Sequence, residues 1–307
     1  MRIVVMGSGG LGGYFGGLLA RSGADVTFIA RGANLHALQE RGLSVHSIQG
    51  DFVLPVQACA DPAGLPAADF ILFGVKTYDA VAAAALLQPV VTARTILLTL
   101  QNGVDMAADL QAAFGRGTVL GGVTRVGSTL SAPGVIEQPT TDRVIEFGSL
   151  TGQEHGQVNY TRTLLEGAGI PTLVSQNIQR SLWEKLVFIA PFSGLSTLTR
   201  LTPAQLLAHE PTRALYRTVM QETAAVAQAA AGVTPDIVAR TMHYLAAAGD
   251  PGESSMAVDF QRRRRIEVEA INGAVVRHGQ RLQVPTPLNQ MLYHALVVMD
   301  HYNRQAA

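Results

Sequence analysis

A glycine-rich turn directly after an apolar strand is the feature that most constrains the fold. Residues 3–6 have the pattern of a buried strand, and Gly7-Ser8-Gly9-Gly10-Leu11-Gly12 follow at once and open a helical stretch. In such a turn the first glycine allows the tight bend, the second lets the backbone approach a pyrophosphate, and the third lets the helix pack closely on the strand. The N-terminus of the helix offers free N–H groups to phosphates. We therefore predict a dinucleotide-binding unit in which Gly7, Ser8, Gly9, Gly10, Leu11 and Gly12 contact the nucleotide.

The next part of the chain alternates between strand and helix patterns. Strands are predicted at residues 3–6, 25–29, 70–74, 95–100 and 118–122. This alternation is typical of an α/β fold with a Rossmann-type doubly wound parallel sheet. Residues 133–149 begin with a Pro-Gly turn and alternate in polarity, which predicts antiparallel strands added to that sheet. With a helix at 157–166 and a strand at 171–174, the first domain is predicted to cover residues 1–176.

Strand patterns stop after residue 176, and long helical patterns follow. A second, mostly α-helical domain is therefore predicted over residues 177–307. Its helices are predicted at residues 178–190, 203–209, 212–230, 235–248, 256–278 and 287–302.

Arg31 stands where the second strand ends, a position that usually carries an acidic residue in NAD-binding units. A guanidinium suits the 2′-phosphate of NADP instead, so the expected cofactor is NADPH. Lys76 and Asn102 follow two later strands, and ligands of open α/β sheets bind at these carboxyl ends. We expect both residues to contact the cofactor, with plain turn or cap residues as the alternative.

Only two of the 23 basic residues are lysines, Lys76 and Lys185, and the other 21 (23 minus 2) are arginines. A lysine can lose its proton when it is desolvated, whereas an arginine stays charged and is a poor general acid. The two lysines are therefore predicted to occupy sites that need an ammonium group, although compositional bias alone could leave two lysines.

Composition narrows the class of partner. The chain is 48% hydrophobic and 15% charged with no formal net charge, which favours small molecules over nucleic acid. The run Arg262 to Arg265 is interpreted as a solvated helix segment. No apolar stretch is long enough for a membrane span, and the eight histidines lack metal-ligand spacing, so neither membrane nor metal is expected.

The single cysteine, Cys59, favours a reducing compartment, and the chain starts directly in a strand pattern without a targeting segment. The cytoplasm is therefore the expected location. The apolar faces of the C-terminal helices suggest a homodimer.

Taken together, the motifs of the chain resemble those of the ketopantoate reductase (2-dehydropantoate 2-reductase) family over nearly the whole length. The likeness rests on the glycine turn, Arg31, Lys76, Gln101-Asn102-Gly103, Trp183-Glu184-Lys185-Leu186, Ser254-Ser255-Met256, Asp259, Glu267 and Ile271-Asn272-Gly273-Ala274-Val275-Val276. Members reduce ketopantoate to pantoate with NADPH, a step of pantothenate biosynthesis.

The resemblance also implies roles for single residues. It makes Lys185 the proton donor to the ketone and Glu267 the carboxylate that supports it. It places Ser255 at the substrate, Asn102 at both nicotinamide and substrate, and Arg31 on the 2′-phosphate. An ammonium near the carbonyl oxygen suits this chemistry, because hydride transfer to carbon builds negative charge on the oxygen.

Three positions depart from the family pattern. Members typically carry asparagines four and eight residues after the catalytic lysine and three residues before the serine, and this chain has Ile189, Ser193 and Gly252 there. Ser193 is kept as a substrate-binding candidate. Each lost polar contact should cost a hydroxylated substrate about 1–3 kcal/mol.

These departures leave the substrate open. One alternative is a reductase of another, more apolar 2-oxo acid, and a second is a non-catalytic NADPH-binding sensor.

Overall fold

The computed structural model describes residues 1–152, 156–250 and 252–305, and the chain forms two compact units. The first unit comprises Met1–Gln101 and Met106–Ile178, and the second comprises Asn102–Asp105 and everything from Gln179. The short segment Asn102–Asp105 thus packs with the second unit although its neighbours in sequence belong to the first. The predicted boundary after residue 176 divides the chain once and therefore places Asn102–Asp105 in the first domain.

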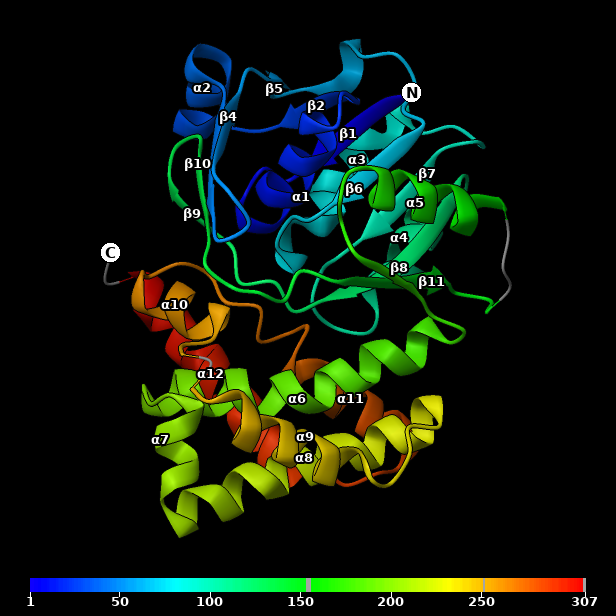
Figure 1. Cartoon of the computed structure of the whole chain (residues 1–307). Coiled ribbons are helices and arrows are strands. Elements are labelled where there is room, and N and C mark those ends of the chain that lie inside the picture. Colours follow the sequence, from blue (N-terminus) through cyan, green and yellow to red (C-terminus); the bar gives the residue numbers. More distant parts are fainter. Residues whose placement is uncertain (153–155, 251, 306–307) are drawn as a thin grey trace. The chain divides into compact units, whose positions relative to one another are not determined.

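The first unit is built on an eight-stranded sheet (Figure 1). Its strands run in the order β12 (Thr172–Val174), β11 (Ile145–Ser149), β8 (Thr118–Thr124), β7 (Ile96–Thr99), β6 (Phe70–Phe73), β1 (Arg2–Met6), β2 (Asp25–Ile29) and β5 (Gln57–Cys59). The six strands from β8 to β5 are parallel, β11 is antiparallel to β8, and β12 runs parallel to β11. The predicted α/β class and Rossmann-type sheet are confirmed.

Helices cover both faces of this sheet because alternate strand residues point to opposite sides. In β1, Ile3 and Val5 pack in one core with α1 (Gly10–Arg21) and α5 (Gly156–Gly167). Val4 and Met6 pack in the other core with α3 (Ala80–Leu87) and α4 (Met106–Phe114). This double covering explains why the parallel strands read as continuous apolar runs.

A second, four-stranded sheet corrects one prediction. Its order is β4 (Phe52–Leu54), β3 (Leu43–Ser47), β10 (Val135–Gln138) and β9 (Thr129–Ala132), and α2 (Gly32–Arg41) precedes β3. Strand β10 pairs in parallel with β3, so the β9–β10 hairpin does not join the main sheet as expected, and only β11 does. The pairing joins segments about ninety residues apart, which local alternation does not encode.

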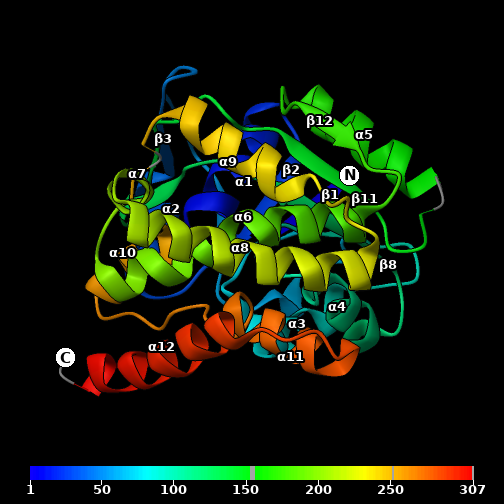
Figure 2. The ribbon, with the colours of Figure 1, turned by 90° about the horizontal axis from the view of Figure 1, so that it is seen from below.

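The second unit is helical, as predicted. Its helices are α6 (Ile178–Thr199, which starts at the last residue of the first unit), α7 (Pro203–Ala208), α8 (Glu210–Ala231), α9 (Ile237–Ala248), α10 (Ser255–Gln261), α11 (Asn272–Leu282) and α12 (Pro287–Gln305). Helix α8 contacts α7, α9, α11 and α12, and Figure 2 shows it running along the unit. Helix α8 thus connects these four helices of the unit.

Two helix predictions in this unit were wrong in extent. Helix α6 continues through Pro191 to Thr199 instead of ending at residue 190. The single helix expected at 256–278 is two helices, and the backbone of Arg263 between them has a left-handed φ of 54°. The run Arg262 to Arg265 therefore lies in the break and not on a helix, and Arg264 pairs with the buried Asp259 at 2.7 Å.

Within the described ranges, no helix combines the length and the apolar character that crossing a membrane requires.

Candidate active site

The glycine turn between β1 and α1 is packed as tightly as its motif predicts. Gly7 has a left-handed φ of 96°, and a Cβ there would lie 2.8 Å from the backbone nitrogen of Val75. A Cβ on Gly12 would lie 2.0 Å from the carbonyl oxygen of Gly7. Side chains are therefore excluded at both ends of the turn, and the backbone just before Lys76 lies against its beginning.

The middle of the turn differs from its ends. Gly9 is the N-cap of α1, its φ of −76° suits any residue, and a Cβ there would have no neighbour within 4 Å. A Cβ on Gly10, by contrast, would clash with the backbone of Ser128, and Leu11 packs partly buried against the core. The first turn of α1 holds no acidic side chain. The turn thus leaves open space for a ligand at Gly9, beside a helix N-terminus that favours anions.

Ser8 is held by Asn34, a residue that the sequence analysis did not select. The Asn34 side-chain amide donates to the hydroxyl and to the carbonyl oxygen of Ser8, at 2.9 and 3.2 Å. Its Oδ1 accepts from the backbone N–H of Gly134 at 2.8 Å. Asn34 therefore ties the glycine turn to the β9–β10 hairpin, a link that no local motif signals.

Arg31 lies at the N-cap of α2 with its side chain 88% exposed. Its guanidinium donates to the carboxylate of Asp79 at 2.9 Å. Lys76 is the N-cap residue of the short 3-10 helix Thr77–Asp79, which follows β6. The segment from Lys76 to Asp79 therefore contains both the predicted cofactor lysine and the partner of Arg31. Gln101 is buried and donates to the carbonyl oxygen of Val75 at 2.9 Å, which fixes the same segment.

Lys185 and Asn102 are brought together in the second unit. The Lys185 ammonium donates to Oδ1 of Asn102 at 3.0 Å, across a sequence separation of 83 residues. Lys185 lies on α6 and is only 8% exposed. A lysine held in this way is shielded from water and has a defined direction, which a proton donor requires.

The remaining substrate and catalytic candidates also lie in the second unit. Glu267 is buried in the turn that leads into α11. Ser193 is buried on α6, two helical turns after Lys185. Ser255 is exposed as the first residue of α10, whereas its neighbour Ser254 is buried and caps the helix by accepting from the Ala257 N–H at 3.1 Å.

The positions that depart from the family pattern have distinct environments. Ile189 is buried one turn after Lys185, on the same face of α6. Gly252 has a left-handed φ of 74°. That conformation favours glycine over most other residues, which gives a local reason for its presence.

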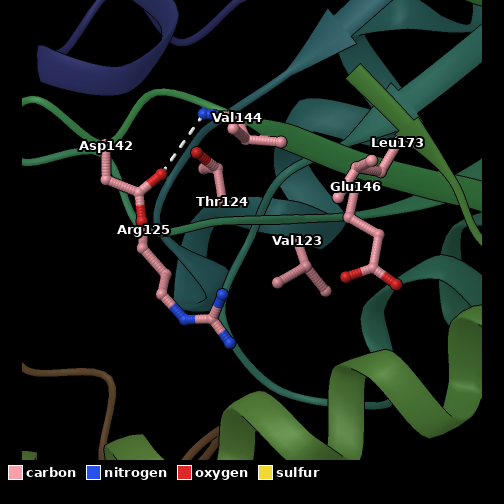
Figure 3. A pocket seen from close by; sticks show the side chains of 7 residues that line it. All are labelled: Val123, Thr124, Arg125, Asp142, Val144, Glu146 and Leu173. Carbon is pink, nitrogen blue, oxygen red and sulfur yellow. Dashed lines mark hydrogen bonds between the residues drawn. The ribbon is translucent and has the colours of Figure 1, made fainter. Parts of the chain in front are cut away.

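A hollow of about 180 Å³ lies elsewhere on the first unit (Figure 3). It is lined by Val123, Thr124, Arg125, Asp142, Val144, Glu146 and Leu173, from β8 to β12. In Figure 3 the Asp142 carboxylate turns toward the backbone N–H of Val144, at 3.4 Å. No predicted site residue lines this hollow, so we assign it no part in the site. Among the described residues, no three potential metal ligands cluster.

The fold and these residues define a class of protein. The chain combines a Rossmann-type sheet that has an open glycine turn with a buried lysine that is hydrogen-bonded to an amide. These features are typical of a nucleotide-dependent oxidoreductase. Comparison with known proteins gives the family. The description "Ketopantoate reductase PanE/ApbA" matches residues 3–152, and its C-terminal counterpart matches residues 177–300. The chain belongs to the ketopantoate reductase family and is an oxidoreductase of the kind that acts on a CH–OH group.

Individual relatives agree with this assignment. The chain is 31% identical to a 2-dehydropantoate 2-reductase of Nostoc sp., with 99% of this chain and 96% of that protein covered. It is 32% identical to the PanE/ApbA family ketopantoate reductase structure from Ralstonia eutropha, with a TM-score of 0.90, covering 99% of this chain and all of that one. A D-mandelate dehydrogenase solved with NADH and anilino(oxo)acetate shares the fold, with a TM-score of 0.86 at 22% identity and coverage of 100% and 99%.

Proposed function

We propose that this protein reduces ketopantoate to pantoate with NADPH, which would give it a role in pantothenate biosynthesis. The observation that carries the proposal is the buried Lys185 ammonium, 3.0 Å from Oδ1 of Asn102. Relatives named 2-dehydropantoate 2-reductase, at about 30% identity over nearly the whole chain, support the same substrate.

The first unit fits a bound dinucleotide. Gly7 and Gly12 are packed with no room for a side chain, whereas Gly9 leaves open space before the helix N-terminus. We assign the pyrophosphate to residues 7–12, the 2′-phosphate to Arg31, and a further cofactor contact to Lys76. Asn102, which packs with the second unit, is also assigned a cofactor contact. When bound, NADPH supplies the hydride for the carbonyl carbon.

The second unit then acts on the carbonyl oxygen. As the carbon is reduced, negative charge grows on this oxygen, and the Lys185 ammonium stabilises the charge and delivers a proton. Oδ1 of Asn102 accepts a hydrogen bond from one of the three ammonium N–H groups and so fixes the orientation of the ammonium. We assign the buried carboxylate of Glu267 to support of Lys185, and Ser193 and Ser255 to the substrate.

The alternative substrate is a 2-oxo acid with a more apolar side chain. Ile189 favours it, because a buried isoleucine replaces an amide where the family binds polar groups of ketopantoate. A hydroxyl left unpaired there costs about 1–3 kcal/mol, enough to change the preferred substrate.

The deciding experiment follows the loss of NADPH absorbance with ketopantoate and with a panel of unhydroxylated and bulkier 2-oxo acids. A clear preference for ketopantoate supports the first substrate, and fast turnover of an apolar 2-oxo acid with poor ketopantoate supports the second. If NADPH binds but no carbonyl compound is reduced, the result supports the hypothesis of a non-catalytic NADPH-binding sensor. The same assay with NADH tests the cofactor preference.

We also propose a cellular location and an assembly state. The single cysteine favours the reducing cytoplasm. Exposed Met291, Val298 and Tyr302 on α12 are apolar or aromatic side chains of the kind that a second copy covers in a homodimer, and light scattering would measure this.

A further inference from the structure

The segment Asn102–Asp105 connects β7 to α4, both in the first unit, yet it packs with the helical unit. Its first residue, Asn102, bonds the Lys185 ammonium. The two sides of this catalytic pair come from segments 83 residues apart in sequence. Two further contacts, made by Gly103 and Asp105, also hold the segment in place.

One such contact is made by Gly103. Its φ of 96° is left-handed, and a Cβ there would lie 2.8 Å from the carbonyl oxygen of Ala270. The backbone of the segment thus lies directly on the turn between Glu267 and α11. This steric contact limits how closely the segment approaches Ala270, but it does not fix the orientation of the Asn102 side chain.

Asp105 provides a directional contact at the other end of the segment. Its carboxylate lies 2.7 Å from Nε2 of His278 on α11, whose ring is 13% exposed. Arg281 lies 2.8 Å from Nδ1 of the same ring. An arginine only donates, so Nδ1 accepts and Nε2 carries the proton that is donated to Asp105. His278 therefore bridges a carboxylate and a guanidinium.

The surroundings strengthen this bridge. The rings of His278 and Trp183 meet edge to face with 5.0 Å between their centroids, and Trp183 lies on α6 two residues before Lys185. Arg277 lies 3.7 Å from the Asp105 carboxylate. Burial acts to raise the pKa of Asp105, but the His278 hydrogen bond and the charges of Arg277 and Arg281 outweigh it and hold that pKa below its ordinary value.

We propose that Asp105 and His278 are positioning residues that hold Asn102 against Lys185. The inference rests on the proposed reductase function, in which that pair acts on the carbonyl. Asp105 lies three positions after Asn102, so a shift at Asp105 is transmitted to Asn102 over at most about 11 Å of chain. A displacement of about 1 Å of a reacting group can cost about a hundredfold in rate.

The kinetic test compares disruptive and conservative variants. Asp105→Ala and His278→Phe remove the bond, whereas Asp105→Asn keeps an acceptor and His278→Gln keeps a donor. We expect the disruptive variants to lower kcat about 10- to 100-fold with the melting temperature nearly unchanged, and the conservative variants to recover most of the loss. The Kd of NADPH should change less than kcat, because Asn102 is only one of the assigned cofactor contacts. Glu210→Ala, which removes an exposed carboxylate paired with Arg213 on α8, is the matched control and should keep full activity.

A second measurement is independent of turnover. The chain has only two lysines, so peptide mass spectrometry can follow the modification of Lys185 by an amine-reactive reagent. Loosening of Asn102 should make Lys185 react about threefold faster or more in Asp105→Ala than in the parent. Lys76 lies in the other unit and should react at the parental rate in both proteins.

The outcomes separate the two proposals. If the parent reduces no 2-oxo acid, the proposed function fails, while the Lys185 labelling still tests the positioning role. If Asp105→Ala keeps both the kcat and the labelling rate of the parent, the positioning role is overturned. If the Ala and Phe variants unfold, Asp105→Asn decides through labelling, because its uncharged amide bonds the His278 ring more weakly than the carboxylate does. Labelling of Lys185 faster than in the parent supports the positioning role, and a parental rate overturns it.

Discussion

The guanidinium of Arg31 lies 2.9 Å from the carboxylate of Asp79. The residue that we assign to the 2′-phosphate is thus already paired with an anion, at a place where its own side chain is 88% exposed. A phosphate bound there would share Arg31 with Asp79 and would be repelled by the carboxylate.

The first prediction follows from this pairing. Arg31→Ala should raise the Kd of NADPH about tenfold, because a charge-assisted contact to the 2′-phosphate is lost, and should change the Kd of NADH little. Asp79→Asn should act in the opposite direction and tighten NADPH binding, because the competing charge is removed. Fluorescence titration of both nucleotides measures the effects, with Arg41→Ala on the same helix as control. Equal effects on NADPH and NADH would contradict the assignment.

The second prediction concerns the open space at Gly9. Gly9→Ala should leave the melting temperature unchanged, since a Cβ there meets nothing within 4 Å, yet should weaken NADPH binding about tenfold by obstructing the pyrophosphate. Gly64→Ala is a matched control, because its Cβ also meets nothing and its position is far along the chain. Parental NADPH affinity in Gly9→Ala would remove the glycine turn from the nucleotide site.

The third prediction tests the proton donor. Lys185→Ala should lower kcat about 100- to 10,000-fold while NADPH still binds, because general acid catalysis contributes gains of that size. Lys185→Arg keeps the positive charge but is a poor acid, so it should stay well below the parent. Single-turnover kinetics would measure the loss. Retention of more than about a tenth of the parental rate by the Arg variant would show that charge alone suffices.

The fourth prediction concerns the substrate pocket. Ile189→Asn restores the amide that family members carry one turn after the lysine, and should lower the KM of ketopantoate about tenfold relative to an unhydroxylated 2-oxo acid. The buried position should make the variant less stable, by about 1–3 kcal/mol if the amide stays unpaired without substrate. The ratio of the two KM values is the measurement, and an unchanged ratio would mean that this face of α6 does not contact the hydroxyl.

Some properties of this protein follow from the sequence by itself. The α/β class and the main parallel strands were predicted correctly, because apolar runs and a glycine turn are local patterns that reflect backbone geometry. The family was likewise evident from motifs such as Trp183-Glu184-Lys185-Leu186, whose order along the chain needs no structure. The strands β3, β4 and β5 were missed, since runs of three to five residues carry little periodicity.

Side-chain pairing was decided only by the tertiary structure. Asp105 and His278 are 173 residues apart, and Arg31 and Asp79 are 48 apart. The sequence around each of these residues does not predict its partner, because each contact depends on how whole helices and strands pack. The break at residues 262–271 has the same origin: the segment consists of residues that a helix accepts, yet packing sets a left-handed Arg263 and pairs Arg264 with Asp259. Local patterns selected the candidate site residues, and long-range packing determined which of them meet.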